Sequence, residues 1–216
     1  MKLESHVGRR RFMATALSLG VVAGLPLQHA FAANASESAA AQQVIERLNA
    51  ALMDVLTNGD TMKFEGRYQK LQPVLASAFD IPAMARVATG PKWNELSDAD
   101  KQKMAELFGK YMTTMYAARF RGHGGESFEM GEVKPRDNGN MLVITRMNRK
   151  GGEPVELSYM MKGQADSWKV VDVYYNGSIS QLAQLRSEFS GPMRDGGVQK
   201  LEAALSDKVQ QMQGGA

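Results

Sequence analysis

The sequence contains no cysteine and only three histidines. Without cysteine the chain can form no disulfide, and the thiolate sites that hold structural zinc and iron–sulfur clusters are excluded. His6 and His29 lie in an N-terminal export signal, so His123 is the one histidine expected in the mature chain. We expect His123 to be exposed in a glycine-rich loop. The mature chain therefore has few of the side chains that bind metals or that activate a catalytic nucleophile.

Sequence motifs for nucleotides and nucleophilic catalysis are also missing. The chain has no Walker loop, no GxGxxG fingerprint and no GxSxG elbow. The glycine-rich stretch 121–125 is not followed by the start of a helix, so a loop that ends the preceding helix explains it better than an anion cradle does. We therefore expect no cofactor and no metal.

Residues 1–32 are predicted to form a cleaved export signal. Three arginines at 9–11 precede an apolar stretch over 12–27, and Ala-Phe-Ala at 30–32 offers a cleavage site. Glycine and proline interrupt the apolar stretch, which argues against a membrane span, since a span needs roughly 20 apolar residues. The arginines suit the twin-arginine route and the general secretory route alike. Both routes predict a periplasmic protein.

The loss of this signal changes the charge of the chain. The whole sequence has 26 basic and 23 acidic residues, and the signal holds four of the basic residues against Glu4 alone. The mature chain is therefore formally neutral. Nucleic-acid binding needs a concentrated positive surface, so we expect no nucleic-acid partner.

Helical spacing of apolar residues predicts helices before and after a stretch of strands. Residues 33–41 are rich in Ala and Ser, and we expect them to form a flexible N-terminus. The predicted helices lie at about 44–58, 62–78, 79–87, 98–119, 179–189 and 198–212. Pro73 is expected to break or kink the second of these helices.

From residue 127 the apolar period changes to two. Strands are predicted over 127–134, 141–147, 155–161 and 168–175, and short polar turns join them. Short turns between successive strands indicate an antiparallel meander. We therefore predict an α+β fold in one domain over 42–212, with the sheet covered by helices and an apolar ligand pocket between the two layers.

Methionines are frequent on the predicted inner faces. Methionine is flexible and polarizable, so it suits irregular cores and adaptable apolar pockets alike. Core packing explains the pattern by itself, but a layer of helices on a sheet can also leave a cavity. The predicted lining residues are Tyr111, Met115, Val143, Tyr159 and Met161.

Asp172 stands in an otherwise apolar predicted strand, and Arg186 lies on the helix that follows it. A carboxylate in such a strand is costly without a partner. We expect a structural ion pair between Asp172 and Arg186. The alternative is a general base with a raised pKa, but no second acid or nucleophile is close in the sequence.

Several short pieces occur in a characteristic order and spacing. They are FDIPAMA at 79–85, GPKW at 90–93, Ser97, the aromatic positions Phe108, Tyr111 and Tyr116, WKVVDV at 168–173, GSI at 177–179 and LRSEF at 185–189. Together they resemble the MlaC family of periplasmic lipid-binding proteins, also called toluene-tolerance proteins. The resemblance covers about residues 42–210, and the wording at 79–85 and 90–93 is most similar to the hopanoid-associated HpnM branch.

The resemblance implies a carrier that shields lipid tails between a sheet and helices. It implies phospholipid or a hopanoid as the ligand. It also implies an inner-membrane lipid transporter complex and an outer-membrane lipoprotein complex as partners, with the carrier acting as a monomer between the two membranes.

Two other functions remain open from the residues alone. A small periplasmic α+β enzyme would place Asp172 in an open pocket, without a contact to Arg186. A ligand-free periplasmic adaptor would have a solid core. The three hypotheses therefore differ in whether a cavity of lipid size lies between sheet and helices.

Overall fold

The computed structural model describes residues 26–122 and 124–214. Its helices are α1 (Pro26–Ala78), α2 (Ile81–Thr89), α3 (Asp98–Arg119) and α4 (Gln181–Gly214). Its strands are β1 (Ser127–Pro135), β2 (Met141–Arg149), β3 (Gly152–Lys162), β4 (Lys169–Tyr175) and β5 (Ile179–Ser180). Short 3-10 turns lie at Gly90–Glu95, Asp137–Gly139 and Ala165–Ser167. The predicted signal lies outside the described residues up to residue 25, and residues 26–32 continue into α1.

The strands form one antiparallel sheet in the order β1-β2-β3-β4-β5. The predicted meander and the α+β fold class are thereby confirmed. β5 was not predicted, because it has only two residues and pairs with the end of β4 across a tight turn. Asn176 and Gly177 in that turn have φ values of 49° and 72°, a left-handed conformation that Asn and Gly tolerate better than other residues.

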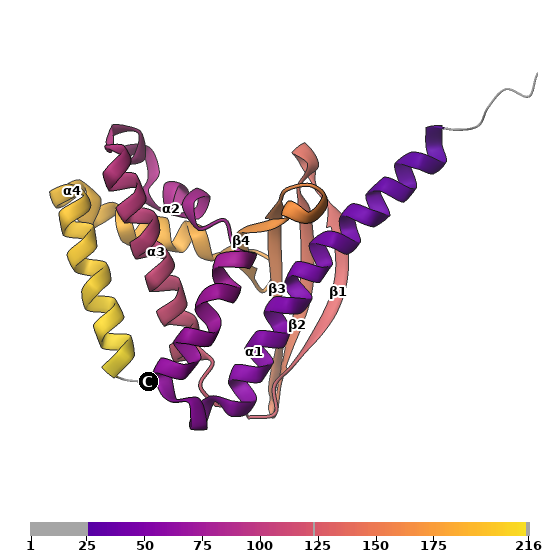
Figure 1. Cartoon of the computed structure of the whole chain (residues 1–216), viewed down its shortest axis with the longest axis horizontal. Helices are drawn as coiled ribbons and strands as arrows, with labels where there is room; N and C mark the ends of the chain where they lie inside the picture. The colour runs from indigo at the N-terminus through magenta and orange to yellow at the C-terminus, as the bar shows by residue number, and fades with distance from the viewer. Residues whose placement is uncertain (1–25, 123, 215–216) are drawn as a thin grey trace, which may run out of the picture.

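The first part of α1 runs along the sheet, and α2, α3 and α4 lie on the opposite side of the molecule from β1 (Figure 1). Apolar residues of α1 recur at helical spacing and are fully buried, including Ile45, Leu48 and Leu52. At the end of α1, Phe79 forms a parallel bridge with Val170 of β4. The helices and the sheet therefore share one core.

Two long helices contain irregular residues. In α1 the backbone leaves helical geometry at Lys63, and in α4 it does so at Gly196 and Gly197. The break in α4 agrees with the two helices predicted there. The helix continues through Pro73, so the expected kink at that residue is wrong. Pro73 is exposed, and the carbonyl that loses its hydrogen bond can be solvated instead.

The predicted flexible segment, residues 33–41, is helical and belongs to α1. Contacts of Glu37 explain why this segment is ordered as a helix. One oxygen of its carboxylate accepts hydrogen bonds from Trp168 Nε1 and from the N–H of Ala165, each at 2.8 Å. This contact joins the beginning of α1 to the turn before β4. No helix within the described ranges 26–122 and 124–214 is long and apolar enough to cross a membrane.

Candidate functional site

A cavity of about 310 Å³ lies between the sheet and the helices. We call it the sheet cavity. Its walls come from α1, α2, α3, the three central strands and the beginning of α4. The lining residues are Leu52, Leu56, Met84, Met112, Met115, Tyr116, Arg119, Phe120, Glu126, Met147, Arg149, Leu157, Tyr159, Val173, Tyr175, Gln181, Leu182 and Leu185. Most of them are aliphatic, aromatic or methionine side chains, as is usual for a site that binds an apolar ligand.

Two of the five residues predicted to line a pocket lie in this wall. They are Met115 of α3 and Tyr159 of β3. Tyr111, Val143 and Met161 are buried in the core and do not line the cavity. The sheet register itself agrees with the predicted inward faces, since Val143 pairs with Tyr159 and Met141 with Met161. All of these residues are buried on the same side of the sheet, but only one end of that side is hollow.

The inner face of the sheet therefore has two parts. The solid half comprises Met141, Val143, Met161 and Val170, which are at most 5% exposed and lie in the main core. The hollow half comprises Met147, Leu157, Val173 and Tyr175, which line the sheet cavity. Tyr159 stands between the two halves and touches the cavity although it is only 1% exposed.

Helix α3 is buried on two faces, which explains why Tyr111 is not at the cavity. The Tyr111 ring meets Phe189 of α4 edge-on, with 6.2 Å between ring centroids. The cavity is lined instead by Met112, Met115 and Tyr116, on the face toward the sheet. Met112 and Tyr116 are four residues apart, so this second stripe could have been found in the sequence. The prediction followed the longer apolar stripe through Phe108 and Tyr111 instead.

Two tyrosines place hydroxyl groups in this apolar environment. Burial raises the pKa of Tyr116 to about 12, and Arg119 opposes the shift in part. Burial also raises the pKa of Tyr159, aided by the hydroxyl of Tyr116, whereas a hydrogen bond with Thr145 opposes it. Both hydroxyls therefore stay neutral at physiological pH. They offer polar anchors without charging the cavity wall.

The charged residues of the wall gather at one end of the cavity. Arg119 is the last residue of α3, and Arg149 is the last residue of β2. Both are exposed, and Arg149 also donates a hydrogen bond from Nη2 to the carbonyl of Glu153 at 3.1 Å. Glu126 and Gln181 are the other polar side chains of the wall apart from the tyrosines. An apolar interior with two guanidinium groups at its opening suits an amphipathic molecule with an acidic head.

Asp172 does not have the partner predicted for it. Among the described residues, no ion pair joins it to Arg186, which is exposed on α4. Its carboxylate accepts hydrogen bonds from Ser180 Oγ at 2.6 Å and from the N–H groups of Val173 and Leu182 at 2.7 and 3.1 Å. The N–H of Leu182 belongs to the first turn of α4, where backbone donors lack helical partners. Asp172 thus joins β4 to α4 by capping the helix.

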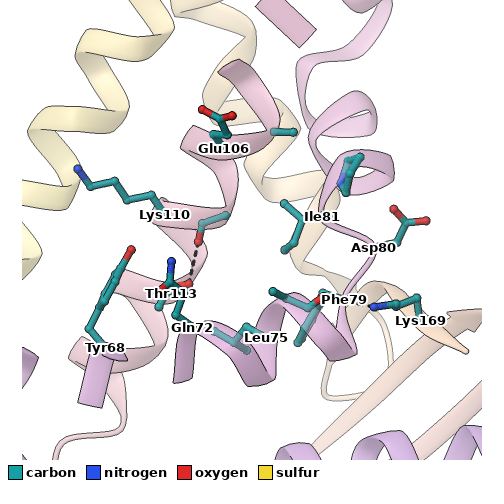
Figure 2. A pocket seen from close by; sticks show the side chains of 14 residues that line it. Tyr68, Gln72, Leu75, Phe79, Asp80, Ile81, Glu106, Lys110, Thr113 and Lys169 are labelled. Atoms are coloured by element: carbon teal, nitrogen blue, oxygen red, sulfur yellow. Dashed lines mark hydrogen bonds between the residues drawn. The ribbon is translucent and has the colours of Figure 1, made fainter. Parts of the chain in front are cut away.

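A second depression, of about 780 Å³, lies among the helices (Figure 2). We call it the helical groove. Tyr68, Leu75 and Phe79 line it from the α1 side, and Glu106 and Lys110 line it from α3. The Phe79 ring meets Tyr116 of the sheet cavity edge-on, at 6.0 Å between centroids, so this pair separates the two spaces. The groove is more open and has more charged residues, so the enclosed sheet cavity is the better candidate for an apolar ligand.

Residues 46–207 match a family model described as MlaC protein. The fold is similar to that of the phospholipid-binding protein from Ralstonia solanacearum, whose structure was solved in complex with a phospholipid. The two chains have 19% sequence identity and a TM-score of 0.68, and the match covers 82% of this chain and 98% of the other. No curated protein gives a significant match.

Proposed function

The chain belongs to the MlaC family, and from this we propose that it binds a lipid in the sheet cavity and carries it between the inner and outer membranes. The cavity between sheet and helices is the observation that carries the proposal. A ligand-free adaptor would have no need of it. The Ralstonia solanacearum protein, which has this fold, was solved with a phospholipid, and this supports the same ligand class here.

The energetics of the cavity suit a lipid tail. Each methylene that leaves water contributes about 0.8 kcal/mol, so a 16-carbon chain contributes on the order of 10 kcal/mol when mostly enclosed. At about 310 Å³ the sheet cavity is at the lower end of the usual range for ligand pockets. It can enclose part of an acyl chain while the headgroup stays at the rim. Binding of this kind needs no bond-making chemistry, so the proposal is a binding protein and not an enzyme.

The rim favours phospholipid over a hopanoid as the ligand. Arg119 lines the cavity from the end of α3 and Arg149 from the end of β2, and both side chains are exposed to solvent. A guanidinium group pairs with a phosphate through two parallel hydrogen bonds. A hopanoid has no phosphate for these groups. We therefore propose that a glycerophospholipid binds with part of an acyl chain inside the cavity and its phosphate between the two arginines.

The remaining parts of the proposal follow from the predicted signal and the family. The carrier acts in the periplasm after removal of residues 1–32, as a monomer. It receives and delivers lipid at an inner-membrane transporter complex and an outer-membrane lipoprotein complex. Asp172 has a structural role in this proposal, because its oxygens are engaged by Ser180 and by backbone N–H groups.

Native mass spectrometry of the exported protein tests the proposal. The full chain is expressed with its signal, recovered from the periplasm and measured without delipidation. We expect a population whose mass exceeds that of the protein by one phospholipid, identified by extraction. The double variant Arg119→Ala, Arg149→Ala should retain several-fold less phosphatidylglycerol, because two charge-assisted hydrogen-bonding groups are lost. Recovery of ligand-free protein alone would contradict lipid carriage, and an unchanged double variant would contradict the headgroup assignment.

A further inference from the structure

A third pocket, separate from the sheet cavity, lies where α1 is interrupted and α3 ends. We call it the kink pocket. Its volume is about 510 Å³, and its lining residues are Asp60, Lys63, Phe64, Arg67, Arg121 and Gly122. Three of these residues are cationic and one is acidic. None of them lines the sheet cavity.

Arg67 is the least exposed residue of this pocket, with only 4% of its surface accessible. Its Nε donates to the carbonyl of Ala117 at 2.8 Å, and its Nη1 donates to the carbonyl of Gly59 at 3.0 Å. Its Nη2 has no hydrogen-bond partner among the described residues. Burial lowers the pKa of Arg67, the nearby Arg121 lowers it further, and Asp60 raises it. A buried guanidinium thus keeps one donor group unused beside a second cation.

The backbone at Lys63 is strained in a way that shapes the pocket. Its φ of 54° and ψ of −175° belong to a region that is almost restricted to glycine. The helix resumes after Lys63 and continues to Ala78. The first N–H groups of a helical segment have no helical partners and form a favourable environment for an anion. The strained residue therefore brings a lysine and a helix N-terminus to the same pocket.

Tight packing holds the pocket together. A Cβ atom on Gly59 would lie 2.8 Å from the carbonyl oxygen of Arg121, so α1 approaches the end of α3 as closely as the backbone permits. The kink of α1, the end of α3 and the turn between β2 and β3 lie at the same end of the molecule, the lower end in Figure 1. Arg119 lines the rim of the sheet cavity, and Arg121, two residues later, lines the kink pocket.

We propose that the kink pocket binds a phosphate-type oxyanion, held by Lys63, Arg67 and the N–H groups that follow Lys63. Asp60 offsets one of the two positive charges of Lys63 and Arg67, so these three side chains together leave the pocket with a net positive charge, which favours an anion. The oxyanion is either free phosphate or the headgroup phosphate of a lipid in a membrane surface. The site shares no lining residue with the sheet cavity, so it does not rest on the proposed lipid carriage.

The first experiment is calorimetric titration of the delipidated full chain with inorganic phosphate, in a chloride buffer. Lys63→Gly should weaken phosphate binding on the order of tenfold, because a charge-assisted contact is lost. It should not destabilise the protein, because glycine adopts this backbone geometry without strain. Asp60→Asn should strengthen phosphate binding severalfold, a direction that structural damage would not produce. Lys92→Ala, on the turn between α2 and α3, is the control and should leave binding unchanged.

The second experiment separates the two sources of the anion. Vesicle flotation compares phosphatidylglycerol vesicles with phosphatidylcholine vesicles for the unmodified chain and for Lys63→Gly. Loss of flotation with the phosphatidylglycerol vesicles in the variant would assign the site to headgroups, and unchanged flotation would assign it to free phosphate. Absence of phosphate binding by the unmodified chain, or equal binding by Lys63→Gly, would overturn the proposal. Lipid retained by Lys63→Gly in native mass spectrometry reports on the sheet cavity independently.

Discussion

The solid half and the hollow half of the sheet have the same sequence pattern but different surroundings. In β2, Met141 and Val143 of the solid half and Met147 of the hollow half alternate with outward residues, and their side chains face the helices. The solid half is covered where Phe79 meets Val170 and where Trp168 and Glu37 join β4 to α1. The hollow half faces the end of α3 and the start of α4 across the sheet cavity. Alternation therefore decides which face is apolar, and the helices decide whether that face is filled.

The largest effect should come from filling the hollow half. Leu157→Trp places a larger ring in the cavity wall, and we expect loss of most of the bound lipid, because the acyl chain loses burial worth about 0.8 kcal/mol per methylene. Native mass spectrometry of protein recovered from the periplasm measures this. Leu142→Trp makes the same exchange on the strand β2 at a residue that does not line the cavity. It should leave lipid retention unchanged, and equal loss in both variants would contradict the assignment of the cavity.

Matched methionine truncations should separate the two halves by stability. Met161 is fully buried in the solid half, whereas Met147 is partly exposed and lines the cavity. We expect Met161→Ala to lower the free energy of unfolding by about 3 kcal/mol, since a packed side chain leaves a new void. Met147→Ala should cost roughly 1 kcal/mol, because its side chain already borders empty space. Chemical denaturation of delipidated protein measures both values, and similar costs would mean that the two halves are equally packed.

The junction of β4 and α4 borders the hollow half and should depend on Asp172 but not on Arg186. We expect Asp172→Ala to lower the free energy of unfolding by about 2 kcal/mol, because Ser180 and the N–H of Leu182 lose their acceptor. Arg186→Ala should change it by less than about 0.5 kcal/mol, as is usual for an exposed side chain. Denaturant melts of the two variants test this. Equal losses of unfolding free energy in the two variants would indicate an ion pair between Asp172 and Arg186.

The smallest effect should be a pH dependence that arises from Tyr116 at the cavity wall. Its pKa is about 12 in the folded protein and close to 10 in an unfolded chain. Above pH 10 the unfolded chain releases this proton first, so the free energy of unfolding should fall by roughly 1 kcal/mol between pH 10 and 11. Tyr116→Phe should remove this part of the decline, while Tyr159 continues to contribute. An identical decline in the variant would show that Tyr116 titrates normally.

Much of the fold could be predicted from local patterns. The helices at 79–87 and 98–119 and the strand at 168–175 differ from α2, α3 and β4 by only a few residues at their ends. Pro73 misled the prediction because its effect on a helix depends on solvation of the carbonyl that it leaves free. The order of residues 33–41 was missed because it depends on Glu37 and Trp168, which are far apart in the sequence.

The candidate site was less predictable than the fold. Met115 and Tyr159 line the cavity, but Tyr111, Val143 and Met161 share their periodicity and lie in the solid core. Asp172 was expected to need a partner, and it has one, but the partner is the beginning of α4 and not Arg186. In each case the residue type indicated that the side chain would be buried or paired. Which residues it contacts could be known only from the three-dimensional arrangement.

The sequence by itself determined the fold class, the inward faces of β2 and β3 and the resemblance to the MlaC family. These properties depend on residues that are close in the chain or on the order of short motifs. Only the tertiary structure decided where the sheet cavity lies, that Arg119 and Arg149 share its rim, and that Lys63 and Arg67 meet at the kink pocket. A cavity is space between elements that are distant in sequence, so its position follows from how helices and sheet pack and from no single segment.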